Sequence, residues 1–576
     1  MTTVDRAAAW ATGRATALLP RRQDLVDMTR SPRRDLVAGL TVGIVALPLA
    51  LAFGISSGMG AGAGMVTAVV AGLLAAIFGG SNLQVSGPTG AMTVVLVPII
   101  AEFGGSGVLV VGLMAGLLLV GMAAAGAGRY VKLIPLPVIE GFTLGIAVII
   151  AVQQVPAALG VTGEGENVVV VAWRAAVEWL AAPQWWPLVL AAGVALVMLV
   201  GSRVRPALPA SLIAVVAATL AAETLDLDVA RIGALPAGLP APGVPVVPWA
   251  DLGALVVPAV AVALLAALES LLSATVADAM SVSERHDPDR ELFGQGVANL
   301  ASPLFGGIPA TAAIARTAVN VRSGASSRLA AVIHALVLLA AMMLLAQVVG
   351  TIPLAALAGV LIATALRMVE VSSVRALLRS SRGDAAVLVL TALATVALDL
   401  VTAVVLGVLV AGALALRQIA QAATLQEVPL EPVPGTRSED AEEHALLDEH
   451  IVAYRLDGPL FFVGAHQSLL ELSELSDIRV VILRMSRVAT LDATGAAVLR
   501  DTIRQLEGRG ISVMLSGVKE QHSPVLDALG VYESLAHEQH LFATTPEAIA
   551  HARLHAARTP HDPTGPEKPS DPLEAA

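Results

Sequence analysis

One acidic residue lies inside an otherwise apolar stretch of this sequence. Glu269 follows several turns of apolar residues in LGALVVPAVAVALLAALESLLSATVADAM, and Ser273 lies four residues later on the same face of a helix. A carboxylate within a bilayer is costly and is a functional hypothesis by default. Its charge is removed by a proton or by a bound cation, so we expect the state of Glu269 to be coupled to the movement of an ion. The alternatives are a structural ion pair with Arg316 and a cavity-lining role without coupling.

Two Gly-Pro segments have the chemistry of an anion site. One reads QVSGPTGAMT (84–93) and the other GGIPATAA (306–313). Proline favours the first turn of a helix, so each segment is expected to be extended chain that leads into a half-helix. Unpaired N–H groups and the positive dipole end at a helix start favour an anion. The residues that we expect to face it are Pro88, Thr89, Gly90, Ala91, Ala310, Thr311 and Ala312. The alternative is that these small residues serve only helix packing.

The composition places most of the chain in a membrane. Of 576 residues 56% are hydrophobic and 14% are charged, against about 25% charged in soluble proteins. Apolar runs long enough to cross a bilayer predict about fourteen spans. They begin near Leu36, Ala61, Pro88, Val108, Pro135, Pro187, Leu208, Leu252, Glu291, Pro309, Leu329, Pro353, Ala385 and Thr402. The segment 168–180 is expected to be an amphipathic interfacial helix.

The interrupted spans hold the third position in each set of seven, and such matched interruptions indicate the binding site of an inverted-repeat transporter. Lys and Arg fall almost wholly on one side of this arrangement, which predicts cytoplasmic N- and C-termini in a bacterial inner membrane. Asp278, Glu140, Glu370, Asp399 and His334 lie nearer the span ends, and we expect them to be solvated there.

The chain divides into five predicted segments. Residues 1–34 form a cytosolic N-terminal segment, 35–420 the transmembrane domain and 421–449 an acidic linker. Residues 450–557 alternate strand-like runs (IVAYRL, LFFVGA, VVILRM, ISVMLSG) with helix-like ones, which predicts a small cytosolic α/β domain. The last residues, 558–576, are rich in Pro and Asp and are expected to be disordered.

In the order of these motifs the chain resembles the SulP sulfate-permease family, the bacterial relatives of solute-carrier family twenty-six. The motifs are RDLVAGL (34–40) with LPLA (47–50), VSGPT (85–89), RTAVN (316–320) and DLVT (399–402), followed by a cytosolic STAS domain. The resemblance implies an all-α membrane domain in a seven-plus-seven inverted repeat, with a core of spans 1–4 and 8–11 and a gate of spans 5–7 and 12–14. It also implies elevator-type alternating access and a homodimer.

The same resemblance places the anion between spans 1, 3, 8 and 10, and adds Phe53 to the candidate residues. Many sulfate-type members have Gln and Tyr where this chain has Leu49 and Phe53. This variant looks more like members that take up bicarbonate or dicarboxylates with Na⁺ or H⁺. By that likeness Glu269, Ser273 and Thr311 are candidate Na⁺ ligands. Arg316 would tune the potential of the site or attract the anion.

The STAS domain differs from anti-sigma-factor antagonists at one position. The loop that presents a phosphorylatable Ser in those proteins reads LDATG (491–495) here, with Ala493 at the Ser position. A phosphorylation switch is therefore not expected here, since Thr494 is only a weak substitute, and we expect a scaffolding or regulatory interaction with a cytosolic partner rather than nucleotide sensing.

The predicted function is coupled symport of a small anion, with bicarbonate or dicarboxylate favoured and sulfate possible. The alternatives are an anion exchanger or channel-like conduit, a nucleobase–cation symporter, and a sensor that no longer transports. The sequence shows no Ser-His-Asp constellation, phosphate-cradling loop or metal-spaced His cluster. We therefore expect no enzymatic activity, no cofactor besides the coupling ion and no nucleic-acid partner.

Overall fold

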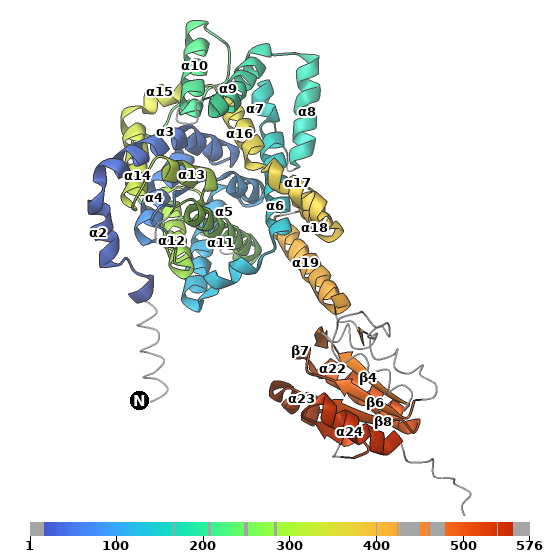
Figure 1. Cartoon of the computed structure of the whole chain (residues 1–576). Helices are drawn as coiled ribbons and strands as arrows, with labels where there is room; N and C mark the ends of the chain where they lie inside the picture. The colour runs from blue at the N-terminus through green and yellow to red at the C-terminus, as the bar shows by residue number, and fades with distance from the viewer. Residues whose placement is uncertain are drawn as a thin grey trace, which may run out of the picture. The chain divides into compact units, whose positions relative to one another are not determined.

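The structure is a computed structural model with two compact units, Met1–Ala411 and Gly412–Ala576. It describes residues 16–163, 165, 167–204, 209–246, 251–281, 285–398, 400–422, 425–426, 450–456, 458–460, 478–537 and 540–556. The predicted tail, most of the predicted linker and Asp399 lie outside these residues. Figure 1 shows the elements of both units, which are described separately below.

The first unit is almost entirely helical. In chain order its main helices are α2 (Arg22–Arg30), α3 (Pro32–Ser56), α4 (Ala61–Phe78), α5 (Gly90–Ala125), α6 (Leu136–Gln153), α7 (Val155–Leu159), α8 (Val168–Ala181), α9 (Trp185–Val204), α10 (Ala210–Thr224), α11 (Leu252–Met280), α12 (Pro288–Ala301), α13 (Ile314–Arg322), α14 (Leu329–Leu344), α15 (Ala346–Gly350), α16 (Leu354–Met368), α17 (Val371–Ser380), α18 (Arg382–Ala397) and α19 (Leu400–Ala422), the last of which runs into the second unit.

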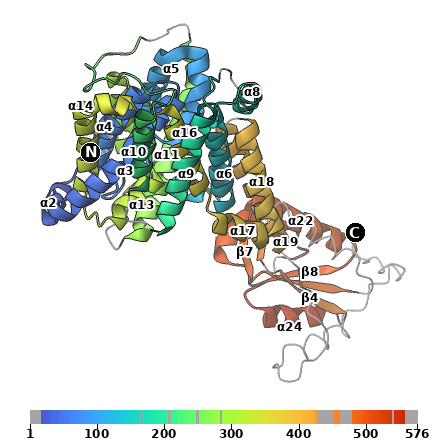
Figure 2. The same cartoon turned by 90° about the horizontal axis from the view of Figure 1, so that it is seen from above.

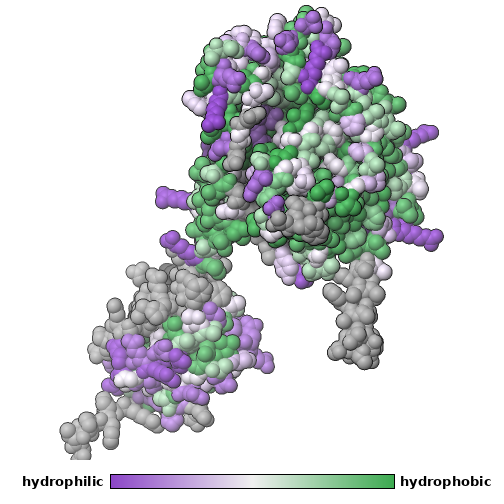
Figure 3. Space-filling view, turned by 180° about the vertical axis from the view of Figure 1, so that it is seen from behind, coloured by the Kyte–Doolittle hydropathy of each residue, from purple (hydrophilic) through white to green (hydrophobic). Residues whose placement is uncertain are grey.

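Six helical stretches among the described residues are long and apolar enough to cross a membrane, and four shorter helices are also apolar. Their exposed side chains include Leu117, Leu196, Val257 and Leu409, and hydrophobic residues cover much of the face in Figure 3. In water such a surface would be very unfavourable, so it suits lipid.

Helices lie at all fourteen predicted span positions. The third and fourth spans run together as α5, which has one non-helical residue, Gly104, between its two parts. The amphipathic segment forms α8, which buries only Ala172 and Ala175. The count of fourteen membrane crossings and the inverted repeat stay predictions.

The helices of this unit pack in two groups. In one, α5 packs on α11 and α12, α4 packs on α12 and α14, and α3 packs on α14 and α13. In the other, α6 packs on α18 and α16, and α9 packs on α16 and α10. Figures 1 and 2 show these groups side by side. Their membership matches the core and gate that the family resemblance implies.

The second unit is a sheet with helices on both faces. Its strands β3 (Leu425–Gln426), β4 (Ile451–Leu456), β6 (Val480–Arg484), β8 (Ser512–Ser516) and β9 (Leu541–Phe542) pair in that order. Residues alternate between faces along a strand. Val481 and Leu483 therefore pack towards α22 (Ala493–Gly508), whereas Val480 and Ile482 pack towards α24 (Thr545–Ala556).

The predicted α/β domain is thus confirmed in outline. Three of the four predicted strands are β4, β6 and β8, and the predicted helices are α22, α23 (Ser523–Ala528) and α24. The run LFFVGA falls almost wholly outside the described residues; only its first residue closes β5 (Gly458–Leu460), which pairs with β7 (Val488–Leu491).

Candidate functional site

The two Gly-Pro segments meet as a pair of short antiparallel strands inside the helical unit. In β1 (Ser86–Gly87) and β2 (Thr311–Ala312), Ser86 pairs with Ala312 and Gly87 with Thr311. Each strand is followed within a few residues by a helix, α5 from Gly90 and α13 from Ile314. Because the strands pair directly, both helix starts lie beside the same point. The extended chains therefore satisfy each other's backbone groups inside the helical unit, as non-helical chain within a membrane would require.

The prolines lie earlier than predicted. Pro88 precedes α5 by two residues and Pro309 precedes α13 by five, so neither occupies the first helical turn. Thr89 is the N-cap of α5, and its hydroxyl accepts a hydrogen bond from the Met92 N–H at 3.5 Å. A proline outside the helix ends the strand pairing, because it has no N–H to donate.

Glu269 contacts the start of α5 directly. The Thr89 hydroxyl donates a hydrogen bond of 2.9 Å to Oε2 of Glu269. Glu269 keeps some solvent exposure, while Thr89 is 6% exposed. One hydroxyl therefore links the carboxylate of α11 to the free amino end of α5.

The start of α13 is held by a neighbouring serine that the sequence analysis did not name. The hydroxyl groups of Ser270 and Thr311 lie 3.0 Å apart, and Ser270 Oγ accepts from the Ala312 N–H at 3.2 Å. Ser273 instead donates to Thr317 at 3.0 Å. Of the predicted Na⁺ ligands, Thr311 thus joins the Ser270 group next to Glu269, whereas the described contacts of Ser273 lead to Thr317. The sequence signal that could have identified Ser270 is its position directly after Glu269.

Arg316 lies in the first turn of α13 with its side chain 2% exposed. Its Nη2 donates to the carbonyl of Pro88 at 2.9 Å, and Nη1 is buried without a hydrogen-bond partner in the described structure. Gly87 has a φ of 153°, and a Cβ there would lie 2.7 Å from Nη1. The glycine therefore makes room for the guanidinium.

The alternative of a direct ion pair between Glu269 and Arg316 is not what the structure shows. Among the described residues no ion pair links the two side chains. Each contacts the chain just before α5 instead, Arg316 at Pro88 and Glu269 at Thr89. A negative and a positive group thus flank one helix start without neutralising each other by contact.

A row of polar side chains on α12 supports the strand pair from behind. Asn299 donates to the carbonyl of Ala310 at 2.9 Å and accepts from its N–H at 2.8 Å. Gln295 donates to Ser86 at 2.7 Å, and Glu291 accepts from the Gly80 N–H at 2.8 Å. Residues 291, 295 and 299 follow a four-residue spacing that places them on one helix face. The sequence analysis predicted only that a span begins near Glu291.

The remaining predicted anion-site residues are small or apolar and buried. Ala91 and Ala310 are 0% exposed and Ala312 1%, while Phe53 is 6% exposed. A Cβ on Gly90 would lie 2.3 Å from Cδ1 of Ile150 and 3.2 Å from Cε1 of Phe53. Ile150, on α6, therefore belongs to the second helix group and covers the start of α5.

The sequence analysis expected five further ionisable residues to be solvated at span ends, and one of them is buried instead. His334 is 0% exposed within α14, so that prediction is wrong for this residue. Asp278 lies 2.7 Å from Nδ1 of His286, and Glu140 accepts from Ser373 at 2.7 Å. Glu370 is exposed.

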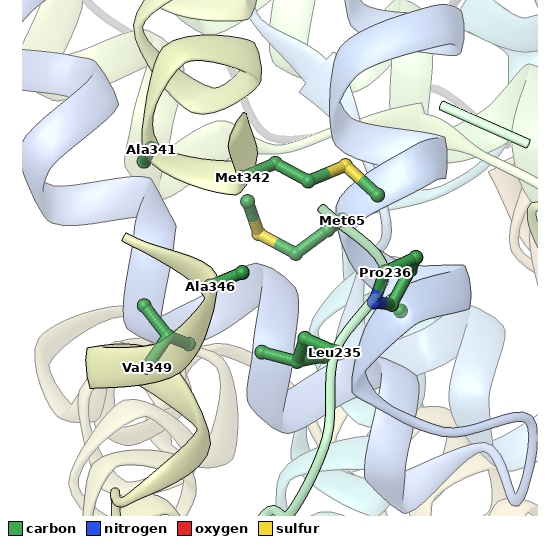
Figure 4. Close-up of a pocket in the computed structure, with 8 residues that line it drawn as sticks. Met65, Leu235, Pro236, Ala341, Met342, Ala346 and Val349 are labelled. Atoms are coloured by element: carbon green, nitrogen blue, oxygen red, sulfur yellow. The ribbon is translucent and has the colours of Figure 1, made fainter. Parts of the chain in front are cut away.

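An apolar pocket lies elsewhere in this unit (Figure 4). Its lining includes Met65 on α4, Pro236 in the chain after α10, and Met342 and Val349 on α14 and α15. None of its lining residues is a candidate anion or ion ligand. A pocket with no polar group offers nothing to hold a small anion.

Comparison with known proteins gives the same two-part organisation. The Sulfate permease family matches residues 33–391 and the STAS domain matches residues 445–548. The chain is 36% identical over 521 residues to YvdB of Bacillus subtilis, a protein named for sulfate transport, covering 88% of this chain and 96% of that protein. It is 32% identical over 556 residues to the bicarbonate transporter BicA of Synechocystis, covering 92% and 96%.

Solved structures agree. The transmembrane domain of a cyanobacterial BicA superposes with a TM-score of 0.61 at 34% identity, covering 65% of this chain and 98% of that one. Murine Slc26a9, an anion transporter in an inward-facing state, superposes with a TM-score of 0.81 at 18% identity, covering 94% of each chain. At 18% identity, the similarity to Slc26a9 shows only that the two chains share a fold.

Proposed function

The chain belongs to the sulfate permease family of membrane anion transporters, and from this premise we propose that it is a secondary active symporter of small anions driven by Na⁺ or H⁺. The observation that supports the proposal best is the hydrogen bond from Thr89 to Glu269 at the start of α5. It joins the group that would carry the coupling ion to the group that would hold the anion.

The anion would bind between the starts of α5 and α13. A helix start contributes about 0.3–1 kcal/mol towards an anion when exposed and about 2 kcal/mol when partly buried. Two such ends, with the unpartnered Nη1 of Arg316 beside them, give modest and reversible binding. Modest binding suits a carrier, because the anion must also leave on the other side.

Coupling would pass through Glu269. While Glu269 is charged, it repels an anion at the start of α5 and competes for the Thr89 hydroxyl. A proton on Glu269, or Na⁺ held by Glu269 with Thr311 and a neighbouring hydroxyl, removes that repulsion. Anion and cation would therefore bind together, which is the requirement for symport.

We infer bicarbonate or a dicarboxylate as the favoured substrate, with sulfate second. BicA relatives align over nearly their whole length, and this chain has the apolar pair Leu49 and Phe53 in the first span. Fewer polar groups near the anion favour a weakly charged species over a strongly hydrated dianion. This argument supports bicarbonate over dianions; the dicarboxylates remain candidates through the family resemblance alone, and the uptake assay below tests them against bicarbonate and sulfate.

The two helix groups provide for alternating access. The candidate anion-site residues all belong to the group that contains α3, α5, α11 and α13, and Ile150 of the other group lies against Gly90 at their edge. We propose an elevator-type displacement of the first group against the second in a homodimer, with the termini in the cytoplasm of a bacterial cell.

The STAS domain would serve as a scaffold for a cytosolic partner. Asp492 accepts from the Gly495 N–H at 2.7 Å and so caps α22, and Ala493 next to it offers no hydroxyl to phosphorylate. The loop is therefore built as a helix start, and a phosphorylation switch is not proposed.

Uptake into proteoliposomes tests the function. Labelled bicarbonate, sulfate, fumarate and succinate are offered under an inward Na⁺ gradient, an inward H⁺ gradient or neither. We expect one anion class to accumulate above equilibrium with one of the two gradients. Equal uptake under all three conditions, or uptake that needs only an opposing anion, would make the protein an exchanger or conduit. No uptake of any anion would favour a sensor.

A further inference from the structure

Three histidines of the STAS domain converge at one end of its sheet. His551 and His555 lie one turn apart on α24, and His540 immediately precedes β9. One ring nitrogen from each of the three lies within 4.8 Å of the others. The ring centroids of His540 and His555, and those of His551 and His555, are 5.0 Å apart.

The buried member of this group has no ordinary structural explanation. His540 is 1% exposed, and neither of its ring nitrogens has a hydrogen-bond partner among the described residues. A buried polar group is normally paired with protein or water. Burial, together with the nearby His555, His551 and His537, lowers the pKa of His540 to about 4, while the Val513 backbone opposes the shift.

We propose that His540, His551 and His555 bind a divalent transition-metal ion, with Zn²⁺ the best fit. Two histidines four residues apart on a helix present their rings on one side, a spacing used in zinc sites. Imidazole suits Zn²⁺, Cu²⁺ and Ni²⁺, whereas Mg²⁺ and Ca²⁺ require oxygen ligands. The sequence analysis missed this spacing, because His540 joins the other two only through the fold.

The geometry requires a small closure of the rings. At Zn–N distances of about 2.0–2.1 Å, tetrahedral nitrogens lie about 3.4 Å apart. His551 and His555 are half-buried, and metal binding would turn their rings towards His540. Three protein ligands leave a fourth position for water or for the exposed His537, whose ring centroid lies 5.9 Å from that of His540.

Such a site would clamp the edge of the sheet to the last helix. Strand β9 pairs with β8 through only two residues, Leu541 and Phe542. A metal shared by His540 and α24 would hold this short strand in place, so binding would stabilise the domain by linkage.

Cobalt and zinc titrations of the full-length protein test the site. The protein is purified without a polyhistidine tag, stripped with EDTA and titrated with Co²⁺, followed by Zn²⁺ competition. We expect one equivalent of Co²⁺ with visible absorption of a nitrogen-rich site, displaced by Zn²⁺, and a higher midpoint for unfolding of the STAS domain.

The variant His551→Ala/His555→Ala is expected to weaken Zn²⁺ binding by about 100-fold or more, since even outer-sphere groups contribute 10–100-fold. Its unfolding midpoint without metal should match that of the wild type, which separates ligand loss from misfolding. The control is His450→Asn, because His450 has a φ of 59° that Asn tolerates. Equal Zn²⁺ binding by the double variant and the wild type, or no binding by the wild type at 100-fold molar excess, would overturn the proposal.

Discussion

The two interrupted segments share a backbone plan but carry different chemistry. Each has a short strand and then a helix start, and the strands pair with each other. The start of α5 is capped by Thr89, whose hydroxyl contacts Glu269. The start of α13 has Ala313 as its N-cap, with no side-chain cap, and carries Arg316 in its first turn. Under the proposed function the similarity would make one anion site, and the difference would place the coupling group Glu269 at the start of α5 and the positive charge of Arg316 in the first turn of α13.

Removing the negative charge of Glu269 is expected to have the largest effect on coupled transport. Glu269→Gln keeps the shape and the contact with Thr89 but cannot be charged. We expect gradient-driven accumulation to fall by about tenfold or more, within the usual range of coupling free energies. Exchange of anion across the membrane without a gradient should continue. A variant that accumulates anion with unchanged gradient dependence would show that coupling does not involve Glu269.

The positively charged residue in this comparison, Arg316, is expected to affect the affinity for the anion. Arg316→Ala removes the unpartnered Nη1 donor that we propose binds the anion, and hydrogen bonds from charged groups contribute about 1.5–3 kcal/mol. We expect KM for the anion to rise about 10–100-fold. The KM of Arg316→Lys should lie between those of the wild type and Arg316→Ala, because lysine keeps the charge but lacks the planar guanidinium group. An unchanged KM in both variants would assign Arg316 to folding alone.

The close contact at the start of α5 predicts a packing defect with a rescue. In Gly90→Ala the added Cβ would lie 2.3 Å from Cδ1 of Ile150, and overpacking costs about 1–3 kcal/mol. We expect turnover to drop by about tenfold. The second change Ile150→Val removes Cδ1 and should restore much of the rate. Failure of the rescue would mean that Ile150 does not limit the site.

The smallest effect on transport is expected outside the membrane. Burial raises the pKa of Asp24, but the hydrogen bonds from Arg290 and Arg21 and the charge of Arg328 outweigh it and leave the pKa below 3.8. Its stabilisation is therefore present above pH 3.8 and lost as the pH falls through the lower folded-state value. Asp24→Asn should lower Tm at pH 7 while anion KM stays unchanged. The difference in Tm between variant and wild type should shrink below pH 3.8; a constant difference would contradict this.

The sequence predicted the motifs better than their partners. Hydrophobic runs and Gly-Pro breaks were enough to place helices at the spans and to select Thr89, Thr311 and Glu269, because these signals are local. Two features depend on contacts that are not local in the sequence. The strand pairing joins residues 86–87 to 311–312, more than two hundred residues away. The hydrogen bond between Asn299 and Ala310 joins residues more than ten positions apart.

One omission and one error had the same origin. Ser270 was not named because helix spacing gives the face of a residue but not the neighbour that the face meets; Ser273 as a ligand of the coupling ion stays a prediction. His334 was predicted to be solvated because the sequence gives its distance from the end of the span but not its burial by neighbouring helices.

Substrate protection of single cysteines tests most directly whether the anion rests between the two helix starts. The chain contains no cysteine, so Ala91→Cys and Ala312→Cys can be labelled singly with a charged methanethiosulfonate, with Arg322→Cys at the exposed end of α13 as the control. We predict that the transported anion slows labelling at both buried positions and leaves the control unchanged. Equal labelling rates with and without saturating anion at Ala91→Cys and Ala312→Cys would contradict the account.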